Sequence, residues 1–367
     1  MQAHVSTFSV PRLCLLAALL AAPLSAGCKE SPKEAAQTGD PEAEGATAEQ
    51  PAATPDGDLF VYVSPDPLGV NPFLIMGKTG IEAAAAKHGA SAKVFESEDP
   101  TSRKDNLRAA VATGAKLVVV LGFAFNDIIV DAAKDSPEVD FLIVDQCVEE
   151  QPKNLHCATF REYEATFLLG AEAAELSRRD HLGVVAALDI PFMHRFTDGF
   201  AQGAKHVKPE IKVDVRWVGG ENPFSDPVRA KEQALALHSA GADIVFAATS
   251  GGDFGIFEAA VEKNFRVMGV DVNMCPSASG RMYDSALKRL DTAMVEAIDA
   301  ILGGAESFSG SYGLKEGGGG LVGFEADLAK SGCLIAEHPE VISKAKALRD
   351  ELIAGTLKLE DPMFAGQ

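Results

Sequence analysis

The loop after the apolar run 59–64 carries side chains that could hold a small molecule. Residues 64–73 are rich in proline and glycine and lead into a predicted helix, whose first backbone N–H groups are free to bind a polar ligand. Asp66 and Asn71 could hydrogen-bond such a ligand, and the ring of Phe73 could stack on it. The alternative is a rigid turn in which Phe73 caps the core.

Two aspartates end other apolar runs. Asp145 ends the run 141–145, and Asp271 ends the run 266–271. A carboxylate at the end of a buried strand is unfavourable unless it faces a cleft, a helix cap or a charged partner. We therefore expect both carboxylates to face a ligand cleft.

A phenylalanine and a lysine complete the candidate site. Phe196 and Phe200 lie four residues apart and share one face of a predicted helix. We expect Phe200 in the core and Phe196, in the first turn, to stack on a ligand, with core packing as its alternative. Lys288, on a predicted helix after Asp271, could pair with an acid or donate to a hydroxyl, unless it is an ordinary exposed lysine.

Residues 251–255 form a glycine-rich turn, Gly-Gly-Asp-Phe-Gly, between a predicted strand and a predicted helix. Asp271 follows Gly251 at the spacing of a dinucleotide fingerprint, but the glycine order differs from G-x-G-x-x-G. We interpret Gly251 as a position where ligand or backbone approaches closely. An NAD-dependent oxidoreductase remains the alternative function.

Nucleophile-elbow, zinc-protease and P-loop motifs do not occur in the sequence, so we expect no enzymatic activity, metal or cofactor.

The elements that must position these residues alternate between strand and helix. Strands are predicted at 59–64, 91–97, 116–122, 140–145, 181–188, 212–219, 243–249 and 266–271, with helices at 73–88, 101–114, 126–136, 163–177, 193–207, 227–241 and 254–264. Most strands are continuous Val/Leu/Ile runs, which is typical of parallel sheets covered on both faces. The pattern predicts an α/β fold with two Rossmann-like, doubly wound lobes.

The rest of the chain indicates that the two lobes are hinged. A polar link at 149–154 precedes a strand-like run at 155–161, and a long helix at 282–302, a glycine-rich stretch at 312–320 and a helix at 339–354 follow the second half. We expect lobe 1 to comprise 58–160 plus about 280–315, and lobe 2 to comprise 161–279 plus about 316–360. A ligand would lie between them, where the carboxyl ends of the strands face each other.

Charge and cysteine content limit the compartment and the partners. Lys+Arg 33 against Asp+Glu 53 gives a net charge of −20, which argues against binding to nucleic acid or to anionic lipid through the protein surface.

Residues 1–27 resemble a lipoprotein signal peptide, and Cys28 is the predicted lipidation site. Residues 28–57 are predicted to be a disordered acidic tether. Cys14 would leave with the signal, so four cysteines remain for two disulfides; Cys147–Cys157, a short loop, is the preferred pair and leaves Cys275–Cys333.

Seven stretches in order resemble the basic membrane protein family of substrate-binding lipoproteins, which includes purine nucleoside receptors of ABC transporters. They are Gly122–Phe125, Phe141–Asp145, Arg161–Glu164, Arg195–Phe200, Gly269–Asp271, Leu287–Asp291 and Tyr312–Gly318. The first loop departs from the family pattern, because Leu74 follows Phe73 where the family has asparagine, and Val272-Asn273-Met274 replace an acid and a glutamine after Asp271.

The resemblance implies a type I periplasmic binding protein fold with a purine held between Phe73 and Phe196. Asp271 and Lys288 would hold the ribose, and Asp145 and Asp66 would line the pocket. It also implies an ABC permease and ATPase as partners, and a lipid-anchored protein of the bacterial cell envelope whose folded part is periplasmic or extracellular. A ligand sensor that does not transport is a further alternative.

Overall fold

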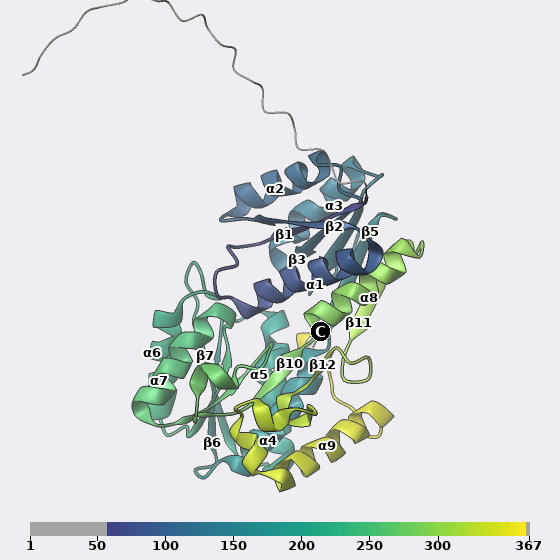
Figure 1. Cartoon of the computed structure of the whole chain (residues 1–367). Helices are drawn as coiled ribbons and strands as arrows, with labels where there is room; N and C mark the ends of the chain where they lie inside the picture. The colour runs from purple at the N-terminus through teal and green to yellow at the C-terminus, as the bar shows by residue number, and fades with distance from the viewer. Residues whose placement is uncertain (1–56, 365–367) are drawn as a thin grey trace, which may run out of the picture. The chain divides into compact units, whose positions relative to one another are not determined.

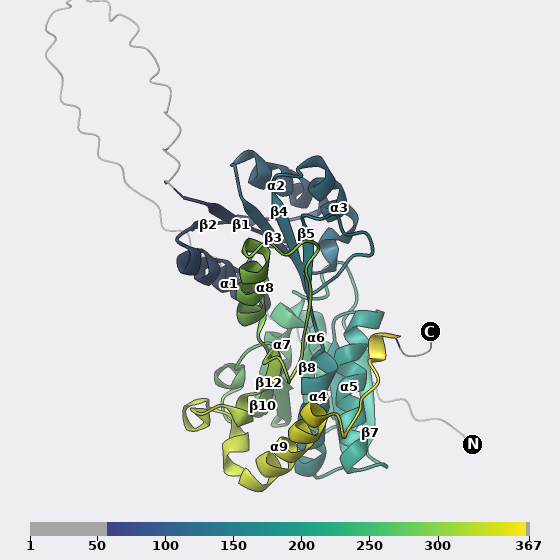
Figure 2. The same cartoon turned by 90° about the vertical axis from the view of Figure 1, so that its right-hand side faces the viewer.

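The computed structural model describes residues 57–364, which form two α/β lobes (Figures 1 and 2). The signal peptide, the lipidation site Cys28 and the tether up to residue 56 are predictions that lie outside the described residues. None of the helices formed by residues 57–364 has the length and apolar character of a membrane-spanning segment.

The first lobe is built on a parallel sheet of strand order β11-β5-β4-β3-β1-β2. Its strands are β1 (Leu59–Ser64), β2 (Ser91–Glu96), β3 (Leu117–Leu121), β4 (Asp140–Val144), β5 (Leu155–Phe160) and β11 (Ser309–Tyr312). The side chains of β3 are buried on both faces of the sheet, as the continuous apolar run predicts.

Two pairs of helices cover this sheet. Helices α1 (Pro72–His88) and α8 (Leu290–Leu302) lie side by side on one face, although they are far apart in the sequence (Figure 1). Helices α2 (Pro100–Ala112) and α3 (Asn126–Asp135) cover the other face. Helix α1 begins where the side chain of Asn71 caps it and Pro72 supplies a favourable φ, and it ends at Gly89 in the left-handed conformation.

The second lobe repeats the arrangement with a sheet of order β12-β10-β9-β8-β6-β7. Its strands are β6 (His181–Ala186), β7 (Lys212–Trp217), β8 (Ile244–Ala248), β9 (Arg266–Gly269), β10 (Met282–Lys288) and β12 (Gly319–Leu321), of which β12 pairs antiparallel. Helices α4 (Glu162–Leu176) and α5 (Pro191–Val207) pack on one face, and α6 (Pro227–Ser239) and α7 (Asp253–Lys263) on the other. Helix α9 (Pro339–Ala354) packs against α4.

Glycines allow α4 and α5 to approach at backbone distance. A Cβ added to Gly170 would lie 1.9 Å from the backbone oxygen of Phe200, and one added to Gly203 would lie 1.8 Å from that of Phe167. A side chain at either position would force the helices apart. This contact fixes the position of α5 relative to α4, and therefore the direction in which the side chains of its first turns point.

The chain passes between the lobes three times within residues 57–364. It crosses at Arg161 between β5 and α4, at Arg289 between β10 and α8, and over 313–318 between β11 and β12. The Arg161 guanidinium pairs with Glu164 in α4 and with Glu316 on the third crossing, so the first and third crossings are tied together.

The expected helix at 282–302 is wrong in its first part. Residues 282–288 form β10, which pairs with β9 and β12 in the second sheet, and only α8 is helical. The lobe boundary therefore lies near Arg289 rather than near 280. Short apolar runs do not distinguish strand from helix by periodicity, and here pairing with two neighbouring strands decides for strand.

The structure contains the Cys147–Cys157 and Cys275–Cys333 disulfides. The first ties the start of the β4–β5 connection to β5, and the second joins the turn after β9 to the segment before α9. Both close loops within one lobe, which leaves the three crossings free of covalent links among the described residues.

Candidate ligand-binding site

A cavity lies between the lobes and opens to solvent, and the empty space there, counted together with the solvent at its mouth, is about 780 Å³. The first lobe contributes Asn71, Phe73 and Asp145 to its wall, and the second contributes Phe196 and Asp271. The position of the cavity is the one expected from strands whose carboxyl ends face each other.

The ammonium of Lys288 is the charged centre of the cavity wall. Lys288 is the last residue of β10, and its side chain pairs with the carboxylates of Asp145 and of Glu162, the latter at 3.0 Å. The expected helical position is wrong, but the expected pairing with an acid is present. Although burial favours the neutral amine, the charges of Asp145, Glu162 and Asp271 raise the pKa of Lys288 above its usual value.

Four phenylalanine rings surround this ammonium. Its nitrogen lies 5.1 Å from the ring centres of Phe73 and Phe160, 5.3 Å from that of Phe192 and 5.5 Å from that of Phe196. Each of these rings can attract the cation through its π face. The site thus combines a buried cation with flat apolar walls from both lobes.

Asp145 and Asp271 both have left-handed backbone conformations, with φ of 73° and 69°. Such angles are unfavourable for residues with a Cβ and occur where the surrounding structure holds them. Asp145 N donates to Ala158 O at 2.7 Å, and Lys288 N donates to Asp271 O at 2.9 Å. Each strained residue is therefore held by the neighbouring strand.

Burial makes these carboxylates weak acids. Desolvation raises the pKa of Asp145 to about 7 and that of Asp271 to about 6, while the Lys288 charge opposes both shifts and Glu162 reinforces them. Near neutral pH, both groups are able to exchange a proton. Each can therefore accept a hydrogen bond when ionised or donate one when protonated.

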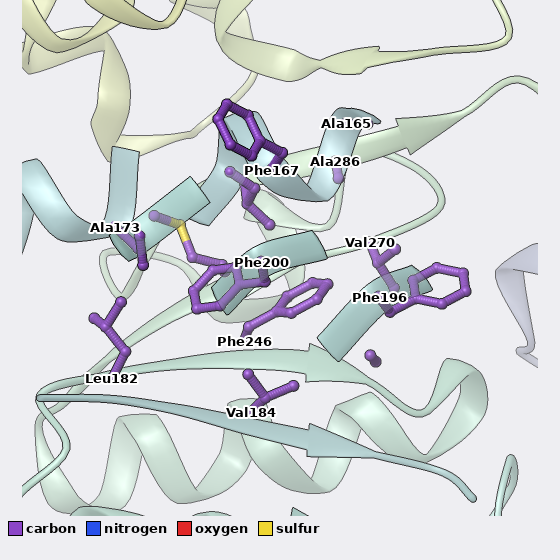
Figure 3. Packing of buried hydrophobic residues seen from close by; sticks show 14 of the residues in the cluster. Ala165, Phe167, Ala173, Leu182, Val184, Phe196, Phe200, Phe246, Val270 and Ala286 are labelled. Atoms are coloured by element: carbon purple, nitrogen blue, oxygen red, sulfur yellow. The ribbon is translucent and has the colours of Figure 1, made fainter. Parts of the chain in front are cut away.

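The rings of Phe73 and Phe196 both border the cavity. Phe196 is also part of the core: it is 6% exposed and makes an edge contact with Phe192 at 5.7 Å. Figure 3 shows Phe196 at the margin of the core cluster, away from the stacked pair of Phe200 and Phe246. Phe200 is a core residue, as expected.

Asn71 and Asp66 line the cavity but are already engaged by the protein. Oδ1 of Asn71 accepts hydrogen bonds from Phe73 N and Leu74 N, and also from Ser250 Oγ of the opposite lobe at 2.9 Å. Asp66 pairs with Arg103 at 3.1 Å and its side chain is 38% exposed, which places it at the rim. Asn71 thus acts as a helix cap that also joins the two lobes.

Gly251, a predicted ligand-binding residue, is not among the residues that line the cavity, whereas the alternative expectation, close approach of backbone to this glycine, is met. The turn 250–252 presents Ser250 instead, and a Cβ on Gly251 would lie 3.3 Å from the backbone oxygen of Phe224. Asp253 caps this turn by accepting from Thr249 N and Oγ1 at 2.7 Å. The glycine turn therefore allows close backbone packing within the second lobe.

Sequence reasoning missed Glu162, Phe160, Phe192 and Ser250. Glu162 is 6% exposed and opens α4 directly after the first crossing between the lobes. It belongs to the stretch Arg161–Glu164, one of the seven that carry the family resemblance, and this was the available signal. Phe192 directly precedes the predicted helix 193–207, which carries Phe196. This position next to a candidate site residue was the available indication that Phe192 belongs to the site.

Two doubly wound lobes that are joined by three crossings and enclose a cavity define the two-lobed periplasmic binding protein fold. A structure from Aeropyrum pernix K1, described as an ABC transporter solute-binding protein, has a TM-score of 0.73 at 22% identity, covering 83% of this chain and 94% of that one. One from Conexibacter woesei has a TM-score of 0.66 at 20% identity, covering 83% and 99%. These likenesses confirm the expected fold.

The chain belongs to the family of PnrA-like ABC transporter substrate-binding proteins, whose model matches residues 60–351. It is 30% identical over 281 residues to the "ABC transporter nucleoside-binding protein BmpA" of Lactococcus lactis subsp. cremoris, covering 71% of this chain and 76% of the relative. It is 28% identical over 239 residues to "Basic membrane protein A2" of Borrelia garinii subsp. bavariensis, covering 63% and 69%. The expected family is confirmed.

Proposed function

We propose that the protein binds a purine nucleoside, or a nucleoside-like ligand, in the cavity between its lobes and delivers it to an ABC permease with its ATPase. The observation that carries this proposal is the set of phenylalanine rings from both lobes around a buried lysine–carboxylate cluster. The relative from Lactococcus lactis, which is named as nucleoside-binding, supports the same ligand class.

The apolar wall suits a flat base. Phe73 comes from α1 of the first lobe and Phe196 from α5 of the second, so closure of the lobes would bring a ring to each side of the ligand. Stacking of a base on an aromatic ring contributes about 1–3 kcal/mol. Two rings and a few charge-assisted hydrogen bonds are enough for a micromolar dissociation constant, which corresponds to about −8 kcal/mol.

The polar wall suits hydroxyl groups rather than phosphate. Asp145 and Asp271 line the cavity and provide acceptors, whereas the buried ammonium of Lys288 is already paired with Asp145 and Glu162. An added phosphate would place like charges close together in a poorly solvated space. A ribose hydroxyl can donate to Asp271 and accept from the Lys288 ammonium.

Isothermal titration calorimetry tests the ligand class. We expect inosine, guanosine or adenosine to bind with a dissociation constant in the micromolar range or below, and the matching 5′-monophosphate to bind at least tenfold more weakly. Absence of binding to every nucleoside would refute the proposal. Binding of NAD in the same titration would instead favour the oxidoreductase alternative.

We further propose that Cys28 carries the lipid that holds the protein at the cell envelope. Several acyl chains would anchor it stably, each methylene contributing about 0.8 kcal/mol. Metabolic labelling with an alkyne fatty acid should mark the wild-type protein and not Cys28→Ala. Labelling that persists in Cys28→Ala would refute this anchor.

A further inference from the structure

The C-terminal segment returns to the helix that borders the cavity. After α9, the chain runs to a short turn at Pro362–Phe364 that packs on α5. There, the carboxylate of Asp361 accepts hydrogen bonds from Arg195 Nε at 2.9 Å and Nη2 at 2.6 Å, and Met363 N donates to Oδ1 at 3.0 Å. The match to the family model ends at residue 351, so this segment lies beyond it.

Arg195 connects this segment to the hinge. It is 9% exposed, and its Nη1 donates to Phe160 O of the first lobe at 2.9 Å. The same nitrogen lies 3.5 Å from a carboxylate oxygen of Glu162. The other oxygen of Glu162 lies 3.0 Å from Nζ of Lys288. Lys288 in turn lines the cavity.

Glu162 is therefore shared between two cations, one on each side. Its oxygens are buried, and within residues 57–364 these cations are its ion-pair partners. Arg195 lies farther from Glu162 than Lys288 does, and its guanidinium is held in a two-point contact by Asp361. If Asp361 lost its charge, Glu162 would be the carboxylate left to Arg195 and would be drawn away from Lys288.

We propose that Asp361 is a positioning residue for the ligand site. By holding Arg195, it keeps Glu162 against Lys288 and so sets the direction in which the Lys288 ammonium faces the cavity. The inference that this affects ligand binding rests on the proposed function. The coupling from Asp361 to Lys288 through Glu162 is a property of the protein alone, and it can be measured without any ligand.

A ligand-free double-mutant cycle tests that coupling. Asp361→Asn and Lys288→Met are combined, and urea unfolding is followed at pH 6, where Asp145 and Asp271, with pKa values of about 7 and about 6, can take up protons. We expect the unfolding constant of the double variant to differ about fivefold from the value that the two single variants predict together. In the Glu162→Gln background, we expect the two effects to be additive. Additivity in the wild-type background, or coupling that persists with Glu162→Gln, would overturn the proposal.

The consequence for binding is tested with inosine as the probe. We expect Asp361→Asn to weaken inosine binding about tenfold, and to have no further effect in Glu162→Gln. Glu175→Gln is the matched control: it removes the 2.8 Å ion pair of Glu175 with Lys344 on α9, also in the second lobe, and should leave affinity unchanged. Unchanged inosine affinity in Asp361→Asn would overturn the positioning role. If the wild type binds no inosine but the double-mutant cycle shows the expected coupling, only the nucleoside assignment is overturned.

Discussion

Replacement of Lys288 by methionine should destabilise the protein in a strongly pH-dependent way. At 3.0 Å, and with an effective dielectric constant of about 20, the attraction between Lys288 and Glu162 alone is about 5 kcal/mol. Asp145 is also in direct contact with the ammonium. Removal of the cation leaves the buried carboxylate of Asp145 without its ion-pair partner and leaves Glu162 with Arg195 alone, and losses of this kind are about 3–5 kcal/mol.

The loss should decrease as the pH falls. Asp145 and Asp271 already have raised pKa values of about 7 and about 6, and the Lys288 charge lowers both. Without the lysine, the pKa of each carboxyl rises further, so the folded variant takes up protons that the unfolded chain does not. A raised folded-state pKa gives stability at low pH that is lost as the pH increases. We expect a loss of about 3–5 kcal/mol at pH 8 and about 1–2 kcal/mol at pH 5.

Urea unfolding followed by circular dichroism between pH 5 and 8.5 measures this effect. Lys78→Met is a suitable control, since Lys78 is half-exposed and pairs with Glu82 at 3.9 Å on the surface. It should change stability by less than about 0.5 kcal/mol at every pH. Glu162→Gln introduced into Lys288→Met should restore part of the stability at pH 8. An equal loss for Lys288→Met at pH 5 and pH 8 would refute the charge argument.

Three further predictions concern the site and the framework. Phe73→Ala should weaken inosine binding by about 5- to 100-fold in calorimetry and Phe196→Ala at least as much, because each removes a stacking surface; unchanged affinity in both would exclude stacking. Asp253→Asn should stabilise the protein by about 2 kcal/mol at pH 8 and not at pH 4, because burial raises the pKa of Asp253 to about 7; a pH-independent effect in urea unfolding would contradict this. Loss of the Cys275–Cys333 disulfide, which spans 58 residues, should cost about 4 kcal/mol, and loss of Cys147–Cys157, which spans 10, about 3 kcal/mol; the reverse order in denaturant would contradict the loop-entropy argument.

Local sequence patterns were sufficient to predict the two-lobed α/β fold. Continuous apolar runs such as those of β3 and β8 are buried on both faces and alternate with helices, and this alternation allows few other architectures. The strand-end positions of Asp145 and Asp271 were predicted for the same reason, because a charged residue that ends a buried run must face an opening or a partner.

The tertiary structure alone decided which charges meet. Glu162, Lys288 and Arg195 are far apart in the sequence and come together because the three crossings bring the ends of β5 and β10 next to α5. Residues 282–288 form a strand since β9 and β12 provide hydrogen-bonding partners on either side, a long-range effect that no local pattern contains. Likewise, Ser250 rather than Gly251 borders the cavity because the direction of a side chain in a turn depends on backbone angles set by its neighbours. The sequence by itself therefore determined the alternating strands and helices of residues 59–271, whereas β10, β11 and β12 and the charge balance of the cavity depended on contacts between distant segments.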